Sequence, residues 1–211
     1  IGCGWGGLAE HAARHYGVQV VGLTVSREQA KLARERCAGL SVEIRLQDYR
    51  ETDGRFDKIA SVGMFEHVGR KNDADFFDAA ARLLKNDGLF LLHTIGTRAA
   101  NPVNDPWIDR YIFPNGELPN VERLTKALRP RFVLEDWHAF GPDYDRTLMA
   151  WWANLERAWP ALEGAGYDER FQRMWKYYLH CSAGFFRSRT GHLWQLVLSH
   201  PGRSGSYRAP R

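Results

Sequence analysis

The first residues of the chain combine a glycine-rich turn with the start of a helix. The turn covers residues 2–7, GCGWGG, and a helical pattern follows over residues 8–16. Glycine lets the backbone pass close to a ligand, and the start of a helix offers unpaired N–H groups and the positive end of the helix dipole. This combination favours a site for a nucleotide-like cofactor, with Gly2, Cys3 and Gly4 as candidate contacts.

The residues after the turn narrow the class of cofactor. No Gly-Lys-Ser or Gly-Lys-Thr run is present, which excludes the phosphate-binding loop of nucleotide hydrolases. A nicotinamide site would place an acidic residue roughly 20 residues further on, but the strand expected there ends at Thr24. Ser26 and Gln29 have the spacing of a helix capping box, in which Gln29 reaches back to Ser26. Alternatively, Thr24 and Gln29 could hold a ribose through neutral hydrogen bonds.

These residues need a scaffold, and the chain alternates strand-like and helix-like segments as a doubly wound α/β sheet requires. We expect strands over residues 19–23, 42–46, 56–62, 88–94, 132–138 and 193–198, and helices over 8–16, 27–38, 73–84, 121–128, 146–158 and 168–186. Residues 95–120 contain four prolines and little periodicity, which predicts a long functional loop or lid. A glycine turn of this kind normally follows a buried strand. We therefore expect a Rossmann-like, mostly parallel sheet whose first strand is truncated at Ile1.

In such a sheet the ligand lies beyond the carboxyl ends of the strands. The glycine turn, Thr24, the pair Asp48-Tyr49, residues 63–66 and residues 93–95 each follow or end an expected strand. The topology thus predicts that these five segments meet at one crevice. Tyr49 could border the cofactor there or pack in the core, and the sequence leaves both interpretations open.

The composition limits the class of protein. At 211 residues and 24.2 kDa, the chain can form one domain, which we place at residues 1–200, before a tail over 201–211 that is expected to be disordered. The net charge of +4 comes with no recognised nucleic-acid motif, so we expect no nucleic-acid partner. No apolar window approaches the roughly 20 residues of a membrane span. The three cysteines show no metal or redox spacing, which predicts a reducing cytoplasm and no metal.

Several runs of residues together resemble the cyclopropane-fatty-acyl-phospholipid synthases, which are methyltransferases that use S-adenosylmethionine. These runs are GCGWGG at 2–7, GLTVS at 22–26, QDYR at 47–50, SVGMFEHVG at 61–69, LHTIG at 92–96, DPWI at 105–108, YIFPNG at 111–116, EDWH at 135–138, FGPDYD at 140–145 and LMAW at 148–151. The resemblance extends to about Ser199. It implies a class I methyltransferase fold in which Gly2 and Gly4 lie beside the amino-acid part of the cosubstrate. Thr24 and Gln29 would hold its ribose, and Asp48 and Tyr49 would border its adenine.

The resemblance also implies the reaction and its base. The sulfonium methyl would be added to the cis double bond of an unsaturated fatty acyl chain in a phospholipid, and loss of a proton would allow a cyclopropane ring to close. The implied base is a bound bicarbonate, held by Glu66, His93, the backbone of Ile95 and Tyr144. The acyl chain needs a dry, electron-rich cavity, for which Phe65, Tyr144, Trp151 and Tyr178 are candidate walls or else ordinary core aromatics.

Alternatives remain for single residues and for the whole chain. Glu66 could instead pair with Arg70 or Lys71 at the surface, and His67 beside it is expected to be structural. Family members carry an upstream cysteine at the bicarbonate site, for which Cys3 is no substitute. The resemblance implies peripheral contact with the inner membrane surface and allows a homodimer. One alternative function is a methyltransferase that acts on another lipid or small-molecule acceptor without closing a ring. The other is a non-catalytic lipid- or partner-binding module.

Overall fold

The computed structural model describes residues 1–100 and 105–210, which form six strands, seven α-helices and three short 3₁₀ turns. The strands are β1 (Val20–Thr24), β2 (Val42–Leu46), β3 (Phe56–Val62), β4 (Leu84–Thr97), β5 (Val133–Ala139) and β6 (Gly191–Ser199). The helices are α1 (Gly7–Tyr16), α2 (Arg27–Arg36), α3 (Asp73–Leu83), α4 (Pro106–Tyr111), α5 (Val121–Leu128), α6 (Gly141–Gly164) and α7 (Glu169–Arg187). The 3₁₀ turns are η1 (Tyr49–Glu51), η2 (Phe65–His67) and η3 (Arg70–Asn72).

The strands form a two-stranded sheet, β1-β2, and a four-stranded sheet in the order β3-β4-β6-β5. β1 and β2 are parallel, as are β3 and β4, whereas β6 runs antiparallel to both β4 and β5. Strands β3, β4 and β5 thus share one direction, and β6 is reversed. The predicted Rossmann-like α/β class is confirmed.

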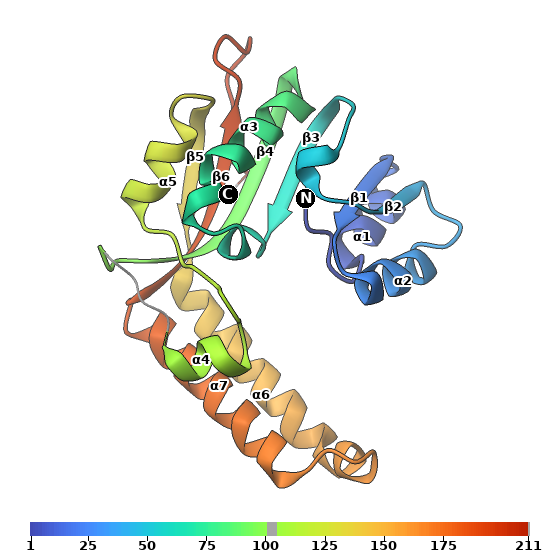
Figure 1. Cartoon of the computed structure of the whole chain (residues 1–211), viewed down its shortest axis with the longest axis vertical. Coiled ribbons are helices and arrows are strands. Elements are labelled where there is room, and N and C mark those ends of the chain that lie inside the picture. The colour runs from blue at the N-terminus through green and yellow to red at the C-terminus, as the bar shows by residue number, and fades with distance from the viewer. Residues whose placement is uncertain (101–104, 211) are drawn as a thin grey trace.

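The first three residues lie between the two sheets. The nitrogen of Ile1 donates to the carbonyl oxygen of Ala60 on β3 at 2.8 Å, and the Cys3 N–H donates to the carbonyl oxygen of Leu23 on β1 at 2.7 Å. Figure 1 shows the N-terminus at this position, between β3 and the β1–β2 unit. The glycine turn therefore starts at the place where the two sheets meet.

A core rich in phenylalanine lies between the four-stranded sheet and helices α3 and α5. Phe65, Phe76, Phe77 and Phe90 are fully buried there and pack edge-to-face or tilted against one another. Successive side chains of β4 point to opposite faces of the sheet, as in any strand. Phe90 and Leu92 enter this core, whereas His93 and Ile95 are only partly buried. His93 and Ile95 consequently share the other face of the sheet.

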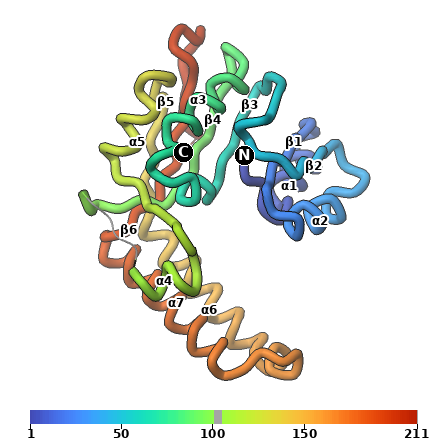
Figure 2. The backbone as a smooth tube through the Cα atoms, viewed as in Figure 1, coloured from blue at the N-terminus to red at the C-terminus, as the bar shows by residue number. Residues whose placement is uncertain are grey.

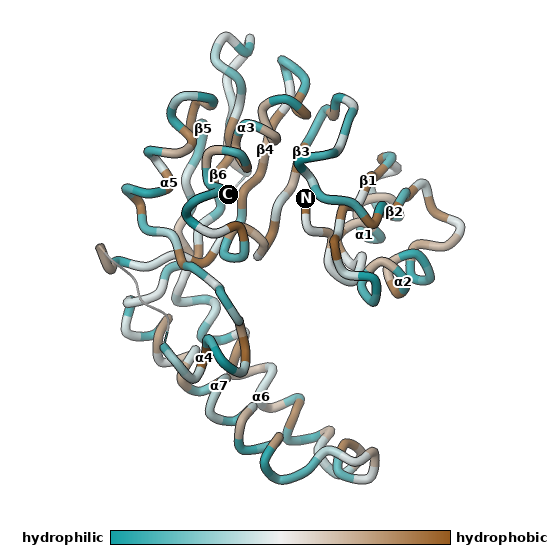
Figure 3. Tube along the Cα trace, viewed as in Figure 1, coloured by the Kyte–Doolittle hydropathy of each residue, from teal (hydrophilic) through white to brown (hydrophobic). Residues whose placement is uncertain are grey.

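Helices α6 and α7 form a hairpin that extends away from the sheet (Figure 1), and the backbone tube in Figure 2 follows the same course. Its inner residues form a second apolar cluster around Leu148, Tyr178, Leu179 and Phe186. Figure 3 shows hydrophilic and hydrophobic colours mixed along both helices. None of the helices in the described residues combines the length and apolar composition needed to cross a membrane.

Three segments differ from the sequence prediction. The segment 95–120, of which residues 101–104 lie outside the described residues, contains helix α4, because the Asp105 carboxylate caps its first N–H groups and Pro106 fits its first turn. Strand β4 is longer than expected at both ends. Helix α6 continues through Pro160 to Gly164, where we had expected its end at residue 158.

The residues after β6 return along the sheet. The ring of His200 lies 3.1 Å, Nε2 to oxygen, from the Leu84 carbonyl, and the Arg203 guanidinium donates to the Asp87 carbonyl oxygen at 3.2 Å. The disorder expected of residues 201–211 stays a prediction, and the contacts of Arg203 count against it for the first of these residues.

Candidate active site

The glycine turn has the positive φ angles that its glycines allow. Gly2, Gly4 and Gly6 have φ angles of 74°, 54° and 83°, which favour glycine over any other residue. A Cβ atom on Gly2 would lie 2.6 Å from Cγ of Met64, whereas one on Gly4 would meet nothing within 4 Å. Gly2 is therefore fixed by packing, and the space beside Gly4 is open to a ligand.

Cys3 lies between these two glycines. Its backbone is tied to β1, and burial raises the pKa of its thiol, so the thiol stays protonated at neutral pH. Its predicted contact with the cosubstrate stays a prediction.

Thr24 and Gln29, the predicted ribose ligands, are in direct contact. The buried Thr24 hydroxyl donates to Oε1 of Gln29 at 2.8 Å and accepts from the Ser26 N–H at 3.2 Å. The Ser26 side chain caps α2 as expected by accepting from the Gln29 N–H. The second half of the capping box is absent, however, because the Gln29 side chain binds Thr24 and does not reach back to Ser26. This leaves the amide group of Gln29 fixed at the carboxyl end of β1.

Asp48 and Tyr49 follow β2, as expected. Both carboxylate oxygens of Asp48 accept hydrogen bonds from the Arg50 guanidinium, at 3.0 and 2.7 Å, and these bonds lower the pKa of the carboxyl. The half-buried Tyr49 ring packs edge-on against Phe76, with 5.5 Å between the ring centroids. Tyr49 thus contacts the core with one edge, and its role beside the adenine stays a prediction.

Glu66 lies in η2, directly after β3, and only 6% of it is exposed. One carboxylate oxygen, Oε1, accepts from the Ile95 N–H at 2.6 Å. The other, Oε2, is buried and has no hydrogen-bond partner among the described residues. Burial raises the pKa of this carboxyl. The alternative in which Glu66 pairs with Arg70 or Lys71 at the surface is wrong, because the side chain points inward to β4.

His93 lies two residues before Ile95 on the same face of β4. Burial lowers the pKa of its ring, so the imidazole is neutral at pH 7. Its Nδ1 is 3.2 Å from the side-chain amide nitrogen of Gln195 on β6. Since an amide nitrogen only donates, Nδ1 is the acceptor and the ring proton resides on Nε2. His93 can therefore donate one hydrogen bond from Nε2.

Gln195 was not found by sequence reasoning. It lies directly opposite His93 in the antiparallel register of β4 and β6. The one available signal is its polarity, because it interrupts the apolar run from Leu193 to Leu198.

Tyr144 enters the same region from the first turns of α6. Burial and the negative charge of Glu66 both raise the pKa of its phenol, so the hydroxyl remains a hydrogen-bond donor at neutral pH. Its ring packs against Phe186 at 4.9 Å and Trp151 at 5.9 Å between centroids. The structure thus brings Glu66, Ile95 and Tyr144 together from three elements, with His93 on the same sheet face.

Comparison with known proteins identifies the family. A sequence profile for mycolic acid cyclopropane synthetase matches residues 1–196. The chain belongs to this family. It is 55% identical over 205 residues to the cyclopropane-fatty-acyl-phospholipid synthase of Escherichia coli K12, which covers 97% of the chain and 53% of that protein. A probable fatty acid methyltransferase of Pseudomonas putida is 37% identical, over 100% of the chain and 56% of that protein. The chain therefore spans about half the length of these relatives.

Solved structures of the mycolic acid cyclopropane synthetase family share the fold. The cyclopropane synthase MmaA2 from Mycobacterium tuberculosis has a TM-score of 0.84 at 30% identity, covering 94% of this chain and 75% of that one. CmaA1 in complex with SAH and CTAB has a TM-score of 0.83 at 30% identity with the same coverage. The chain accordingly has the Rossmann-like fold of this family of S-adenosylmethionine-dependent enzymes.

The candidate cavity walls differ in how deeply their side chains are buried. Phe65 is fully buried in the phenylalanine core, so it is a core aromatic. Tyr178 is 8% exposed and packs edge-on against Phe113, while Trp151 is 45% exposed on α6. His67 is exposed and packs against Phe113, at 6.1 Å between ring centroids, and its structural role stays a prediction.

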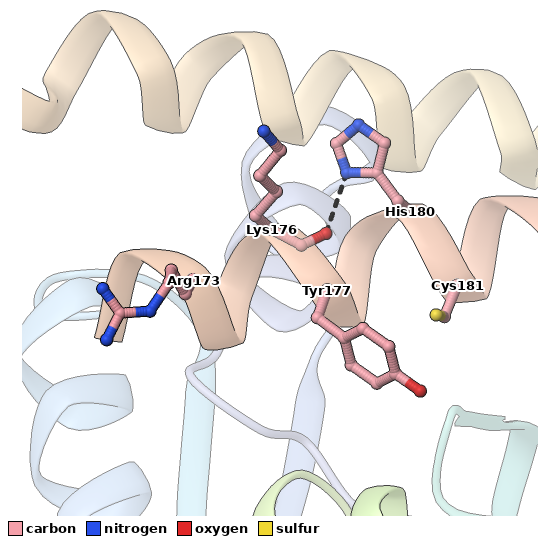
Figure 4. A pocket seen from close by; sticks show the side chains of 5 residues that line it. All are labelled: Arg173, Lys176, Tyr177, His180 and Cys181. Atoms are coloured by element: carbon pink, nitrogen blue, oxygen red, sulfur yellow. Dashed lines mark hydrogen bonds between the residues drawn. The ribbon is translucent and has the colours of Figure 1, made fainter. Parts of the chain in front are cut away.

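Two further features lie outside the candidate site. Within residues 1–100 and 105–210, no group of three or more His, Cys, Asp or Glu side chains is placed to hold a metal ion. A depression along α7 is lined by Arg173, Lys176, Tyr177, His180 and Cys181, with His180 Nδ1 2.8 Å from the Lys176 carbonyl oxygen (Figure 4). It shares no residue with the cluster around Glu66.

Proposed function

We propose that this protein transfers the methyl group of S-adenosylmethionine to the cis double bond of an unsaturated phospholipid acyl chain and closes a cyclopropane ring. The observation that carries the proposal is the carboxylate of Glu66, which is buried beside Ile95 and whose second oxygen has no partner in the described part of the chain. Burial of a carboxylate is costly unless it is paired and hydrogen-bonded, and such perturbed groups are concentrated at functional sites. Membership of the family and the identity to the Escherichia coli synthase support this reaction.

The cosubstrate would lie across the carboxyl ends of β1 and β2 and supply an electrophilic methyl group. Gly2, Cys3 and Gly4 would allow the backbone to approach its amino-acid part. The Gln29 amide, held by Thr24, would bind the ribose hydroxyls, and Asp48 and Tyr49 would border the adenine. Because Thr24 and Gln29 are already hydrogen-bonded to each other, little ordering would be required on binding.

Bicarbonate fits the donors and acceptors of the Glu66 cluster and would accept the proton that leaves before ring closure. His93 Nε2 and the Tyr144 hydroxyl can each donate to an anion, and Glu66 Oε2 can accept the hydroxyl proton of bicarbonate. The Ile95 N–H already donates to Glu66 Oε1. We therefore propose that the Ile95 N–H orients the Glu66 carboxylate. It could donate directly to the anion only if the Glu66 side chain rotated away.

The acyl chain would approach the cluster from the side of the α6–α7 hairpin. Tyr144, Phe140 and Ile95 belong to the apolar cluster of that hairpin, and an apolar wall excludes water from a cationic intermediate. A phospholipid substrate implies peripheral contact with the inner membrane surface. We also propose that residues 1–200 form one catalytic domain.

A methyltransferase that closes no ring is the second candidate. The relatives at 37% and 35% identity carry the names of a probable fatty acid methyltransferase and a tuberculostearic acid methyltransferase. Both reactions would pass through the same cation, so the position of the base relative to that cation would decide between them.

Mass spectrometry of acyl chains tests the proposal. The full-length protein is incubated with S-adenosylmethionine and vesicles of cis-unsaturated phospholipid, with Glu66→Gln as the isosteric control. We expect a gain of one CH₂ with loss of the alkene, and at least a 100-fold slower reaction in Glu66→Gln. A gain of mass with a new methyl branch would support the second candidate. Unchanged lipid alongside tight binding of S-adenosylmethionine would contradict ring closure and favour a methyltransferase with a different acceptor.

A further inference from the structure

A buried ion pair lies behind the turn that carries Glu66. Asp73 begins α3 and Arg123 lies in α5, and their side chains are each 8% exposed. Arg123 donates to both carboxylate oxygens of Asp73, from Nε at 2.6 Å and from Nη2 at 2.7 Å. Such a bidentate pair fixes the guanidinium plane in one orientation.

The guanidinium plane in turn contacts the residue next to Glu66. The Cζ atom of Arg123 lies 5.6 Å from the centroid of the Phe65 ring. Since Phe65 is fully buried among Phe76 and Phe77, the first residue of η2 is held from both sides. Rotation of the η2 backbone would have to displace this ring.

Glu117 also contacts the turn that carries Glu66. Its backbone N–H donates to the carbonyl oxygen of Glu66 at 2.8 Å. Its carboxylate accepts from the Arg70 N–H at 2.6 Å and lies 3.6 Å from Nη1 of Arg123. One residue therefore binds the backbone of Glu66, the start of η3 and the buried arginine.

Glu117 belongs to the segment that connects β4 with α5. The carbonyl oxygen of Pro119 in this segment accepts from the Thr97 N–H at 2.9 Å, and the ring of Phe113 packs against Tyr178 of α7. Because Tyr144 lies on the neighbouring helix α6, the segment forms a continuous path between the hairpin and Glu66.

We propose that Glu117 is a positioning residue for Glu66, with Arg123 and Asp73 as its support. The proposal rests on the proposed function only in assigning Glu66 to catalysis. The Glu117 carboxylate binds the Arg70 N–H and lies close to Arg123, and so holds the Glu117 backbone where its N–H donates to the carbonyl oxygen of Glu66. Loss of this carboxylate would loosen η2 and displace the Glu66 side chain. A displacement of about 1 Å at a reacting group can cost 100-fold in rate.

The test compares Glu117→Ala with Glu117→Gln in the full-length protein. The Glu117 side chain is half-exposed, so neither change leaves a cavity. Alanine removes the acceptor for the Arg70 N–H, whereas the glutamine oxygen retains it. We expect Glu117→Ala to lower kcat about 10- to 100-fold with KM for S-adenosylmethionine unchanged. Glu117→Gln should recover most of kcat.

Asp78→Ala is the matched control. The Asp78 carboxylate accepts two bonds from Arg131, which again links α3 to the region of α5 but lies apart from η2. We expect its kcat to stay within twofold of the wild type. Equal kcat values in Glu117→Ala and Asp78→Ala would overturn the proposal, as would a Glu117→Gln variant as slow as Glu117→Ala.

Amide hydrogen exchange gives a readout that needs no reaction. The N–H groups of Ile95 and Arg70 should exchange at least tenfold faster in Glu117→Ala than in the wild type, and at the wild-type rate in Asp78→Ala. Unchanged exchange in Glu117→Ala would overturn the proposal. If the wild type modifies no lipid, the proposed function fails, and the exchange rates still decide whether Glu117 positions the turn.

Discussion

The candidate site has two halves, one at the carboxyl ends of β1 and β2 and one at those of β3 and β4, and they differ in how many of their polar side-chain atoms are hydrogen-bonded. At the carboxyl ends of β1 and β2, Thr24 is hydrogen-bonded to Gln29 and Asp48 to Arg50. At the carboxyl ends of β3 and β4, the buried Glu66 retains an oxygen without a partner among the described residues. The polar side chains of the first half are thus paired with one another or with a neighbour, whereas one buried carboxylate oxygen of the second half is not.

Under the proposed function, the two halves would serve different tasks. Groups that hold a cosubstrate gain from being fixed in advance, because less ordering is needed on binding. A carboxylate that accepts the hydroxyl proton of bicarbonate instead needs an oxygen that no protein group occupies, and Oε2 of Glu66 has no partner among the described residues. Substitutions in the first half should therefore change affinity, and substitutions in the second should change rate or stability.

The largest effect should come from His93→Ala. Removal of the Nε2 donor should lower kcat about 100-fold or more, with the Kd for S-adenosylmethionine unchanged. Gln195→Leu removes only the partner of Nδ1 and should lower kcat by about tenfold. Steady-state kinetics with isothermal titration of S-adenosylmethionine measures both. If Kd for S-adenosylmethionine rose by the same factor as kcat fell, the claim that the second half affects rate and not affinity would be wrong.

Gln29→Ala should produce the converse result. Loss of the amide that Thr24 holds should raise the Kd for S-adenosylmethionine about tenfold, which corresponds to one lost hydrogen bond, with kcat at saturation unchanged. Gln47→Ala is the control, because this partly buried glutamine also follows a strand, β2, but its side chain donates to the carbonyl oxygen of Glu51 and not to Thr24. Titration calorimetry decides the matter, and equal Kd values for the two variants would contradict the assignment of Gln29.

The smallest effect concerns stability and pH. The folded-state pKa of Glu66 is raised above its usual value of 4.5, so the stability that this group contributes is present below about pH 4.5 and is lost as pH rises through the folded pKa. Glu66→Gln retains an acceptor for Ile95 and carries no charge at any pH, so its free energy of unfolding should gain on that of the wild type as the pH rises from 4.5 to 7. This gain should vanish toward pH 4.5.

Thermal unfolding across this pH range measures the effect. Glu43→Gln is the control, because its exposed carboxylate is paired with Arg45, which lowers its pKa, and it should gain no stability. A Glu66→Gln variant that gains nothing on the wild type between pH 4.5 and 7 would contradict the cost assigned to the buried charge.

Features with local causes were predictable from the sequence. The helix start after the glycine turn, the Ser26 cap and the strand ends depend on φ angles, capping side chains and periodicity, all of which are properties of neighbouring residues. Helix α4 could also have been predicted, because Asp105 and Pro106 form a normal helix start, but the prolines around it pointed to a loop.

Features with distant causes were not predictable. His93 and Gln195 are 102 residues apart, and their pairing depends on the register of β6. The contacts of Arg123 with Phe65 and of Glu117 with Glu66 depend on how α5 and its preceding segment pack on η2. No local pattern encodes these distances, so the residues that support Glu66 emerged only from the structure.

The reversed strand β6 also determines where the chain tolerates changes of length. A slip of β6 by two residues would preserve its inside–outside pattern but would put Leu193 or Val197 opposite His93 in place of Gln195. Insertions in the connection at residues 188–190 should therefore be selected against in homologues. The tip between α6 and α7, residues 165–168, precedes no strand whose register must be kept, so length variation and engineered insertions should concentrate there.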